Sequence, residues 1–416
     1  MSKMSLRNRI LSVVLSVCMM LTLLPWIPMK ASAVDSNGDN GCEHGAHNYD
    51  EVTLLCPCGA VSPDAVTSVT IGDTITYYVT LDEAVQVVKD CTADDKAVVT
   101  MLKSIELDSA LTIESGVFTI DLNDYEISIN KTGASALKIS GAETDVVIMD
   151  SGTLGKITSR NTCIHISKAT VTIMDCEIML DCSGSQTSRY GVYACNSTVT
   201  ITDCEITIYG DLASNYIAYL TSYGVYADNS TVTVSGCTFE EQCNNVRVRH
   251  IEAYASTMTV TDSYISGATL SGSGGSKVTV SGCTVDSDDG SIWAESRCTV
   301  VVNDTTAIGQ ISVSSYATII VNNTTIIEDH LAAVEVWEGD ATISGGCIYA
   351  EFDIAIQSLY STVTLSLNEN GVGTTFPGGI ALSNITLNAI LGEGSSLLAG
   401  RSEDHPSQRC NKNLRR

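Results

Sequence analysis

The chain has 416 residues and a formal net charge of −26 at pH 7, because 48 Asp and Glu outnumber 22 Lys and Arg. Such an acidic chain is unsuited to binding nucleic acid, which is itself a polyanion. Only 6% of the residues are aromatic, and the many Thr, Val, Ile, Ser and Gly residues indicate β-strands rather than one large globular core.

The first predicted element is a secretory signal peptide over residues 1–33. A basic stretch over residues 3–9 precedes an apolar run over residues 10–29, and the small-residue sequence Ala-Ser-Ala follows at 31–33. An uncleaved membrane anchor is the alternative, but the small-residue site favours cleavage. We therefore expect a secreted or extracellular protein that makes no membrane contact after the signal is removed.

Residues 34–66 are expected to be a Cys/His segment and a linker. Their core reads CEHGAHNYDEVTLLCPCG, which contains a C-x-H…C-x-C set with His47 as a spare. The candidate metal ligands are Cys42, His44, Cys56 and Cys58. Thiolates and imidazole can complete a tetrahedral, structural zinc site. Two disulfides, or plain thiols on a linker, explain the same residues equally well.

A short helix is predicted next. Thr80 and Glu83 stand at the N-cap and N3 positions of a capping box. The apolar residues of this helix, about 81–89, share one face: Leu81, Ala84, Val85 and Val88. A repeat array needs a cover over its open first turn, so we expect this helix to be an N-terminal cap.

A repeating unit predicts the architecture of residues 67–398. Residues 190–206 read YGVYACNSTVTITDCEI and residues 223–239 read YGVYADNSTVTVSGCTF, with eleven of seventeen positions identical. Apolar residues alternate with Thr, and the alternation slips at a polar pair such as Thr202-Asp203, which predicts a corner between two strands. Related units at variable spacing predict a coil of parallel strands with loops of changing length. The irregular tail, 399–416, lacks the pattern.

These coils resemble right-handed parallel β-helix proteins of the pectate-lyase-like group. The array also resembles secreted surface proteins of clostridia-like bacteria, on the residues 77–85, 112–116 and 120–123 and over residues 77 to about 398. The resemblance implies an all-β, right-handed parallel β-helix solenoid with a short N-terminal capping helix. It does not imply one function, because lyases, hydrolases, adhesins and phage tailspikes share this cylinder.

One repeat position is occupied by small side chains. The aligned residues are Cys176, Cys204, Cys237, Ser263, Cys283, Thr305, Thr324 and Cys347. A ladder of disulfides or metal ligands is one interpretation of this column. Free Cys also packs well in an interior stack, and Ser and Thr at the same position make that the preferred interpretation.

A second repeat position carries aromatic residues that we expect to point outward, because their neighbours alternate inward. The candidate binding residues are Tyr193, Tyr226, Tyr254, Trp293 and Trp337. Exposed rings in register can stack on the faces of sugars. The alternative is that these rings pack under loops or against each other. His165 is interpreted as an ordinary strand residue.

No set of residues for acid–base catalysis is apparent. Arg247, Arg249 and His250 form the one basic stretch, Asp288-Asp289 is an isolated pair, and the corner Asp residues are ordinary turn residues. No catalytic residue is therefore assigned. We expect a secreted, monomeric, non-catalytic β-helix surface protein that acts in adhesion or glycan binding. The alternative is a polysaccharide lyase or glycoside hydrolase acting on acidic polysaccharide, which clustering of Arg247, Arg249 and carboxylates would favour.

Overall fold

The computed structural model divides the chain into two compact units between Ser62 and Pro63. The residues that it describes are 47–183, 188–210, 221–243, 247–287, 290–328, 332–350, 354–374, 379–383 and 386–389. The predicted signal peptide and irregular tail lie outside these residues, so the domain boundaries drawn from the sequence stay predictions.

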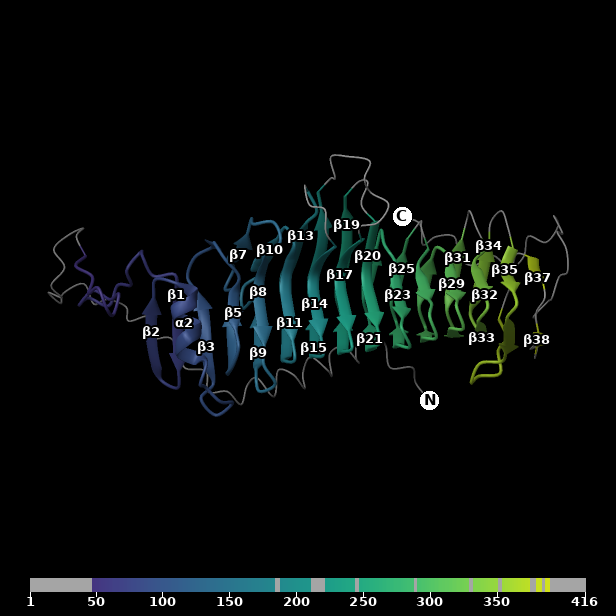
Figure 1. Cartoon of the computed structure of the whole chain (residues 1–416), viewed down its shortest axis with the longest axis horizontal. Helices are drawn as coiled ribbons and strands as arrows, with labels where there is room; N and C mark the ends of the chain where they lie inside the picture. Colours follow the sequence, from purple (N-terminus) through teal and green to yellow (C-terminus); the bar gives the residue numbers. More distant parts are fainter. Residues whose placement is uncertain are drawn as a thin grey trace, which may run out of the picture. The chain divides into compact units, whose positions relative to one another are not determined.

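The second unit is a solenoid of three parallel sheets, whose strands follow one another in the chain as sheet 1, sheet 2 and sheet 3 (Figure 1). Sheet 1 contains, in spatial order, β2 (Thr74–Tyr78), β1 (Thr67–Ile71), β3 (Ala97–Met101), β6 (Val117–Asp121), β9 (Asp145–Met149), β12 (Thr170–Met174), β15 (Thr198–Thr202), β18 (Thr231–Ser235), β21 (Thr257–Thr261), β24 (Lys277–Ser281), β27 (Thr299–Asn303), β30 (Thr318–Asn322), β33 (Asp340–Ser344), β36 (Thr362–Ser366) and β38 (Thr386–Ala389). Sheet 2 contains β4 (Ile105–Glu106), β7 (Glu126–Ile129), β10 (Lys156–Ser159), β13 (Glu177–Asp181), β16 (Glu205–Tyr209), β19 (Thr238–Gln242), β22 (Tyr264–Ser266), β25 (Thr284–Asp286), β28 (Thr306–Ile308), β31 (Thr325–Glu328) and β34 (Cys347–Ala350). Sheet 3 contains β5 (Leu111–Ile113), β8 (Ser135–Ser140), β11 (Thr162–Ser167), β14 (Arg189–Cys195), β17 (Thr221–Asp228), β20 (Arg247–Tyr254), β23 (Leu270–Ser273), β26 (Ile292–Ala294), β29 (Ile311–Ser314), β32 (Val334–Trp337), β35 (Ile354–Leu359) and β37 (Gly379–Ser383).

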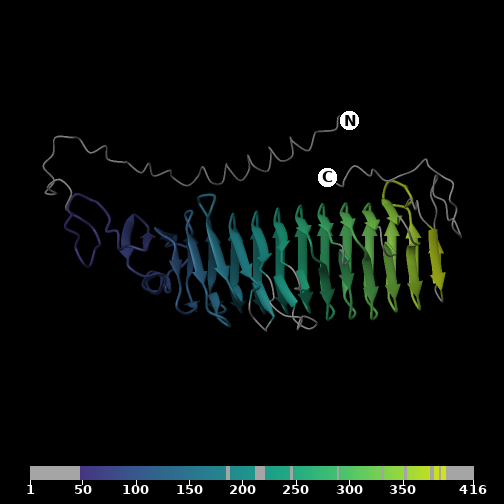
Figure 2. The same ribbon diagram turned by 90° about the horizontal axis from the view of Figure 1, so that it is seen from above.

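Successive turns of this unit stack in register (Figure 2). In β15 and β18, for example, Val199 pairs with Val232 and Ile201 with Val234. All four side chains are buried, while the Thr residues between them are not. The core is therefore a continuous stack of small apolar side chains inside the coil. Only the pairings of β1 with β2 and with β3 are antiparallel among the described strands. The predicted all-β parallel solenoid is confirmed.

The predicted helix is present as α2, Leu81–Val88. The Thr80 side chain accepts a hydrogen bond from the Glu83 backbone N–H at 3.2 Å, as the capping box predicts. The four apolar residues expected on one face are all buried, and the helix packs against β1, β2 and β5. Its role as the cover of the first turn stays a prediction. Among the described residues, no helix combines the length and the apolar character needed to cross a membrane.

The corners of the coil explain the polar pairs in the repeat. Between sheets 1 and 2 the chain bends at one residue with a left-handed backbone, such as Asp175, Asp203 and Gly236, with φ of 54°, 52° and 66°. Asp, Asn and Gly tolerate this conformation best. A second column of left-handed residues, including Asn196 and Asn229 with φ of 51° and 50°, turns the chain from sheet 3 to sheet 1. The predicted corners are confirmed.

The column of small side chains follows the first of these corners. Cys204 donates from Sγ to the Thr202 carbonyl oxygen at 3.2 Å, and Ser263 donates from Oγ to the Thr261 oxygen at 2.8 Å. The same bond spans two residues in each of these turns, so Cys, Ser and Thr are interchangeable as small buried donors. The thiols of Cys176, Cys204, Cys237 and Cys283 are free, as the interior-stack interpretation predicts.

Cys347 does not belong to this column, contrary to the alignment expected from the sequence. It pairs with Thr325, one residue beyond Thr324. The reason is a corner of two glycines, Gly345 and Gly346, with φ of 66° and 79°, which moves Cys347 one place into the next strand. Cys347 is also disulfide-bonded.

Candidate functional site

The outer face of sheet 3 carries tyrosines at an unusual spacing. In β14 the alternation slips, because Gly191 and Val192 are both buried in succession. Tyr190 and Tyr193 therefore both lie on the outside, although a regular strand would place side chains three residues apart on opposite faces. β17 repeats the slip at Gly224.

In β14 and β17 glycine is required at the slip, because the next turn approaches too closely there for a side chain. A Cβ atom on Gly191 would lie 2.6 Å from the Gly224 carbonyl oxygen, and one on Gly224 would lie 2.7 Å from the His250 carbonyl oxygen. In β20 the same place is taken by His250, whose ring lies in the interior at 0% exposure. Its Nε2 atom is 2.8 Å from the Ser266 carbonyl oxygen. The motif YGVY thus places two tyrosine rings on the outer face in each turn.

The outward rings of three successive turns touch one another and form what we call the ring ladder. Its members are His165, Tyr190, Tyr193, Tyr223 and Tyr226. Tyr190 and Tyr223 stack with centroids 5.2 Å apart and an interplanar angle of 8°, and Tyr190 stacks on Tyr193 at 4.9 Å. His165 continues the ladder, 4.9 Å from Tyr193. The rings are half-buried, so they present edges and partial faces to solvent.

The polar groups of the ladder are uncharged at neutral pH. Burial, followed by the nearby charges of Cys195 and Asp228, raises the pKa of Tyr193 to about 12. Burial and then the charge of Glu252 also raise the pKa of Tyr226. Burial, together with the charge of Lys138, lowers the pKa of His165. The ladder therefore offers neutral hydroxyls and a neutral imidazole for hydrogen bonding.

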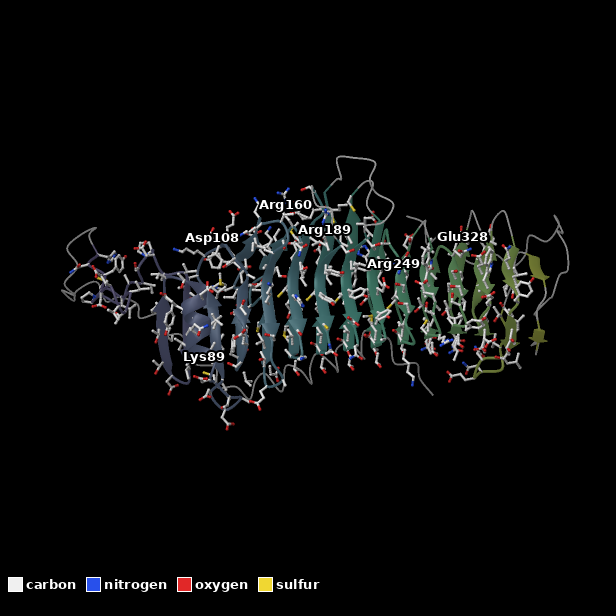
Figure 3. All side chains as sticks on the ribbon, viewed as in Figure 1. Lys89, Asp108, Arg160, Arg189, Arg249 and Glu328 are labelled. Atoms are coloured by element: carbon white, nitrogen blue, oxygen red, sulfur yellow. The ribbon has the colours of Figure 1, made fainter. Side chains whose placement is uncertain are left out.

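The next turn replaces the two rings by an ion pair. Arg249 pairs in register with Tyr223, and Glu252 with Tyr226. The Arg249 Nη1 atom lies 2.9 Å from a Glu252 carboxylate oxygen and 3.5 Å from one of Glu295. The guanidinium carbon lies 5.2 Å from the centroid of the Trp293 ring. Arg249 lies midway along the stack of turns (Figure 3).

This cluster is well covered. Glu252 is only 7% exposed, and the Ser273 hydroxyl donates to its other carboxylate oxygen at 3.4 Å. Burial by itself lowers the pKa of Arg249, but the charges of Glu252 and Glu295 outweigh burial and raise it. The guanidinium is therefore a permanent cation held by two carboxylates.

Two strands of the ladder are entered through the longest connections between sheets 2 and 3. Residues 182–188 lead into β14 and residues 210–220 lead into β17. Arg160 holds the start of the first connection through Asp181 at 3.0 Å and the Ser183 hydroxyl at 2.8 Å. The buried Arg189 ends that connection and donates to the Cys182 carbonyl oxygen. Both arginines mark one edge of the array in Figure 3.

The five aromatic residues expected in one column occupy two. Tyr193, Tyr226 and Trp293 share a register position, with Glu252 and Ser271 between the last two. Tyr254 instead pairs with Asp228 and Ser273, and Trp337 with Ser314.

The distance from ring to corner explains this correction. Ala255 and Glu338, which follow Tyr254 and Trp337, are themselves the left-handed corner residues, with φ of 48° and 52°. Tyr254 and Trp337 therefore stand at corners, 48% and 49% exposed. All five aromatic side chains lie outside the core, as expected.

Strict alternation of buried and exposed residues in the sequence does not predict four residues of this outer face. Tyr190 and Tyr223 belong to the repeat but fall out of phase with strict alternation, and the intervening glycine is the signal that reveals them. Glu252 meets Arg249 within one strand, three residues away, and Glu295 meets it from another turn, where the loop lengths set the register. Of the residues considered for catalysis, Asp288 and Asp289 lie outside the described residues.

The expected metal ligands are partly brought together in the first unit. His47, Cys56 and Cys58 place their donor atoms within 4.8 Å of one another. His47, which the sequence suggested only as a spare ligand, is therefore part of the cluster. Cys42 and His44 lie outside the described residues.

Residues 209–349 match the family model described as the right-handed β-helix region. The solenoid is a right-handed parallel β-helix. No curated protein matches the sequence. Among solved structures, this β-helix is similar to full-length tailspike protein 2 (TSP2, ORF211) from Escherichia coli O157:H7 bacteriophage CAB120, with 9% identity and a TM-score of 0.32 over 82% of this chain and 51% of that chain. The chain thus spans about half the length of that tailspike. The pectate-lyase-like group and the clostridia-like origin stay predictions.

Proposed function

We propose that the chain is a secreted, non-catalytic β-helix protein that binds polysaccharide in adhesion at a cell surface. The ring ladder is the observation that carries the proposal. It places five rings on one outer face over three successive turns, with centroids 4.9 to 5.6 Å apart. Secretion enters the proposal through the predicted signal peptide.

The chemistry of the ladder suits sugars. A tyrosine offers apolar area for the C–H face of a sugar ring and a hydroxyl for hydrogen bonding. Successive turns are spaced by about 4.8 Å, so an extended polysaccharide that follows the axis meets equivalent rings repeatedly. Contiguous rings outside the core are typical of a binding surface.

The charges near the ladder favour a neutral or amino-sugar polymer. Glu252 and Asp228 lie close enough to raise the pKa of Tyr226. Arg249, the cation of the neighbouring turn, is already held by Glu252 and Glu295. At the Tyr226 end of the ladder a polyuronate would therefore meet carboxylates, which weakens its binding there, whereas the charge of Lys138 lies at the His165 end.

The proposal is tested with variants in which a residue is replaced by the residue that a neighbouring turn has at the same register position. Tyr226→Ser and Trp293→Ser introduce the residue found at Ser271 in the same register column, so the strand is expected to tolerate both. Binding of the full-length protein to neutral, amino-sugar and acidic polysaccharides is measured by titration calorimetry, with Tyr316→Ser, an exposed residue outside the ladder, as the control. We expect at least a tenfold loss, or about 1.4 kcal/mol, in Tyr226→Ser, which removes a ring of the ladder, and no loss in Tyr316→Ser. Trp293→Ser tests whether the binding surface extends along the same register column beyond the ladder. If Tyr226→Ser binds every polysaccharide that the wild-type protein binds with unchanged affinity, the ladder has no role in binding.

A polysaccharide lyase or glycoside hydrolase is the second candidate, because Arg249 brings Glu252 and Glu295 together. Hydrolysis needs one carboxyl on each side of the scissile bond, whereas these two carboxylates contact the same guanidinium nitrogen. This arrangement favours the binding protein. Product formation from the bound polysaccharides that disappears in Glu252→Gln and Glu295→Gln, but not in Tyr316→Ser, would establish the enzyme instead.

A further inference from the structure

The described part of the first unit, residues 47–62, is a small hairpin built around a tight turn. Leu55 and Val61 form an isolated β-bridge. The Cys56 N–H donates to the Ala60 oxygen at 2.8 Å, and the Gly59 N–H donates to the Cys56 oxygen at 2.7 Å. Gly59 adopts φ of 87°, a conformation that favours glycine. The turn thereby brings Cys56 and Cys58 onto one side of the hairpin.

A histidine from the preceding residues completes a cluster of donors. The His47 Nδ1 atom lies 3.4 Å from the Cys58 Sγ atom, and the donor atoms of His47, Cys56 and Cys58 are all within 4.8 Å of one another. Around a tetrahedral zinc ion, bond lengths of about 2.3 Å to sulfur and about 2.0 Å to nitrogen place an N and an S ligand about 3.5 Å apart. The spacing of His47 and Cys58 already matches that of two ligands sharing one ion, and Cys56 lies close enough to join them.

We propose that His47, Cys56 and Cys58 bind a structural zinc ion. Two thiolates and an imidazole select zinc over magnesium or calcium, which prefer oxygen ligands. A tetrahedral ion has one further position, and the proposal leaves it to water or to another ligand. Each thiol that binds the ion does so as thiolate and releases its proton.

The hairpin is too small to have a large hydrophobic core, so a bound ion would stabilise it. Within residues 47–62, the buried apolar side chains are those of Leu54 and Cys56. A segment with so little core is not stable through hydrophobic burial alone, and units of this size commonly depend on a metal or a disulfide. Zinc would link His47 to the turn and so close the segment on itself.

The test uses the full-length protein purified with reductant and measures bound zinc by elemental analysis. Cobalt(II) then replaces zinc, because thiolate ligation gives an intense charge-transfer band that a histidine or carboxylate site lacks. We expect one zinc per chain and a thiolate-to-cobalt band. Cys58→Ser and His47→Gln should each weaken zinc binding at least tenfold. Cys91→Ser, which removes a partly buried thiol of the β-helix, is the matched control and should leave zinc binding unchanged.

Three outcomes would overturn the proposal. The first is the absence of both zinc and the cobalt band in the reduced protein. The second is a Cys58→Ser variant that keeps zinc with unchanged affinity. The third is a disulfide between Cys56 and Cys58 as the main form in protein secreted by its natural host, detected by peptide mapping. Limited proteolysis within residues 47–62 that accelerates after zinc is chelated would support the structural role.

Discussion

The backbone of Gly191 lies so close to Gly224 in the next turn that a Cβ atom would stand 2.6 Å from the Gly224 carbonyl oxygen. This contact shapes the outer face, because it is where β14 slips in phase and turns both Tyr190 and Tyr193 outward. The ring ladder therefore depends on a buried glycine that is not itself part of the ladder.

Gly191→Ala should lower stability and disturb the ladder together. The added methyl group meets backbone rather than a mobile side chain, so the strand must shift, at a cost of about 1–3 kcal/mol. Chemical denaturation measures the loss, and near-ultraviolet circular dichroism reports on the tyrosines. Cys195→Ala, which changes an outward side chain of the same strand, is the control. A Gly191→Ala protein with wild-type stability would contradict the packing argument.

Arg249→Ala should destabilise the protein by roughly 3 kcal/mol, because it leaves Glu252 buried without its cation. The preceding turn suggests a rescue. Arg249→Tyr combined with Glu252→Tyr installs the rings found at Tyr223 and Tyr226 in the same register. We expect this double variant to recover most of the denaturation midpoint lost in the single variant. If the double variant is the less stable of the two, the ion pair and the ring pair are not equivalent.

The β-helix should lose stability as the pH falls from about 6.5 towards about 4. Burial lowers the pKa of His250 to about 4 from an ordinary 6.5. Between these values the unfolded chain takes up a proton that the folded protein excludes, so the contribution of His250 is present above pH 6.5 and lost below it. The full effect is on the order of 3 kcal/mol.

His250→Gln isolates this contribution from that of the carboxylates. Denaturation midpoints of both proteins are compared from pH 7.5 to 4, and the variant should show the shallower dependence. His165→Gln should show a smaller change, because that ring is only half-buried. Equal slopes in wild type and His250→Gln would contradict the buried neutral imidazole.

The Cys176 thiol of the small-residue column should resist alkylation in the folded protein. Burial raises the pKa of Cys176 to about 12, so its reactive thiolate is scarce at pH 8. Cys195, on an outward position, provides the comparison. Peptide mapping after iodoacetamide treatment should show native labelling at Cys195 but not at Cys176. In denaturant without reductant, Cys176 should become labelled, and its protection there would reveal a disulfide.

Most of the fold could be predicted because each turn repeats the same local information. Alternating Val, Ile and Thr define the strands, and a residue such as Asp203, in the left-handed region, defines the corner. A parallel stack then places like residues beside like, as Val199 beside Val232. These are short-range patterns that alignment of the repeats reveals.

The site was only partly predictable because its geometry depends on small shifts in phase. Tyr254 precedes its corner immediately, whereas Ala227 and Asp228 separate Tyr226 from its corner. The two tyrosines look equivalent in the sequence but differ by two places in register. Contacts across turns, such as Arg249 with Glu295, depend on loop lengths that vary between turns and carry no periodic signal.

The stacking of turns also makes the ladder adjustable in length. Cys195 and Asp228 occupy equivalent places at the ends of β14 and β17. Removal of residues 196–228 would join one equivalent place to the next and delete a single turn with two tyrosines of the ladder, Tyr223 and Tyr226. Each strand contacts mainly the turns on either side, so the remaining turns would keep their surroundings. Duplication of the same segment would add a pair of rings. Gene rearrangements of this size would thus alter the number of rings on the outer face without a new fold.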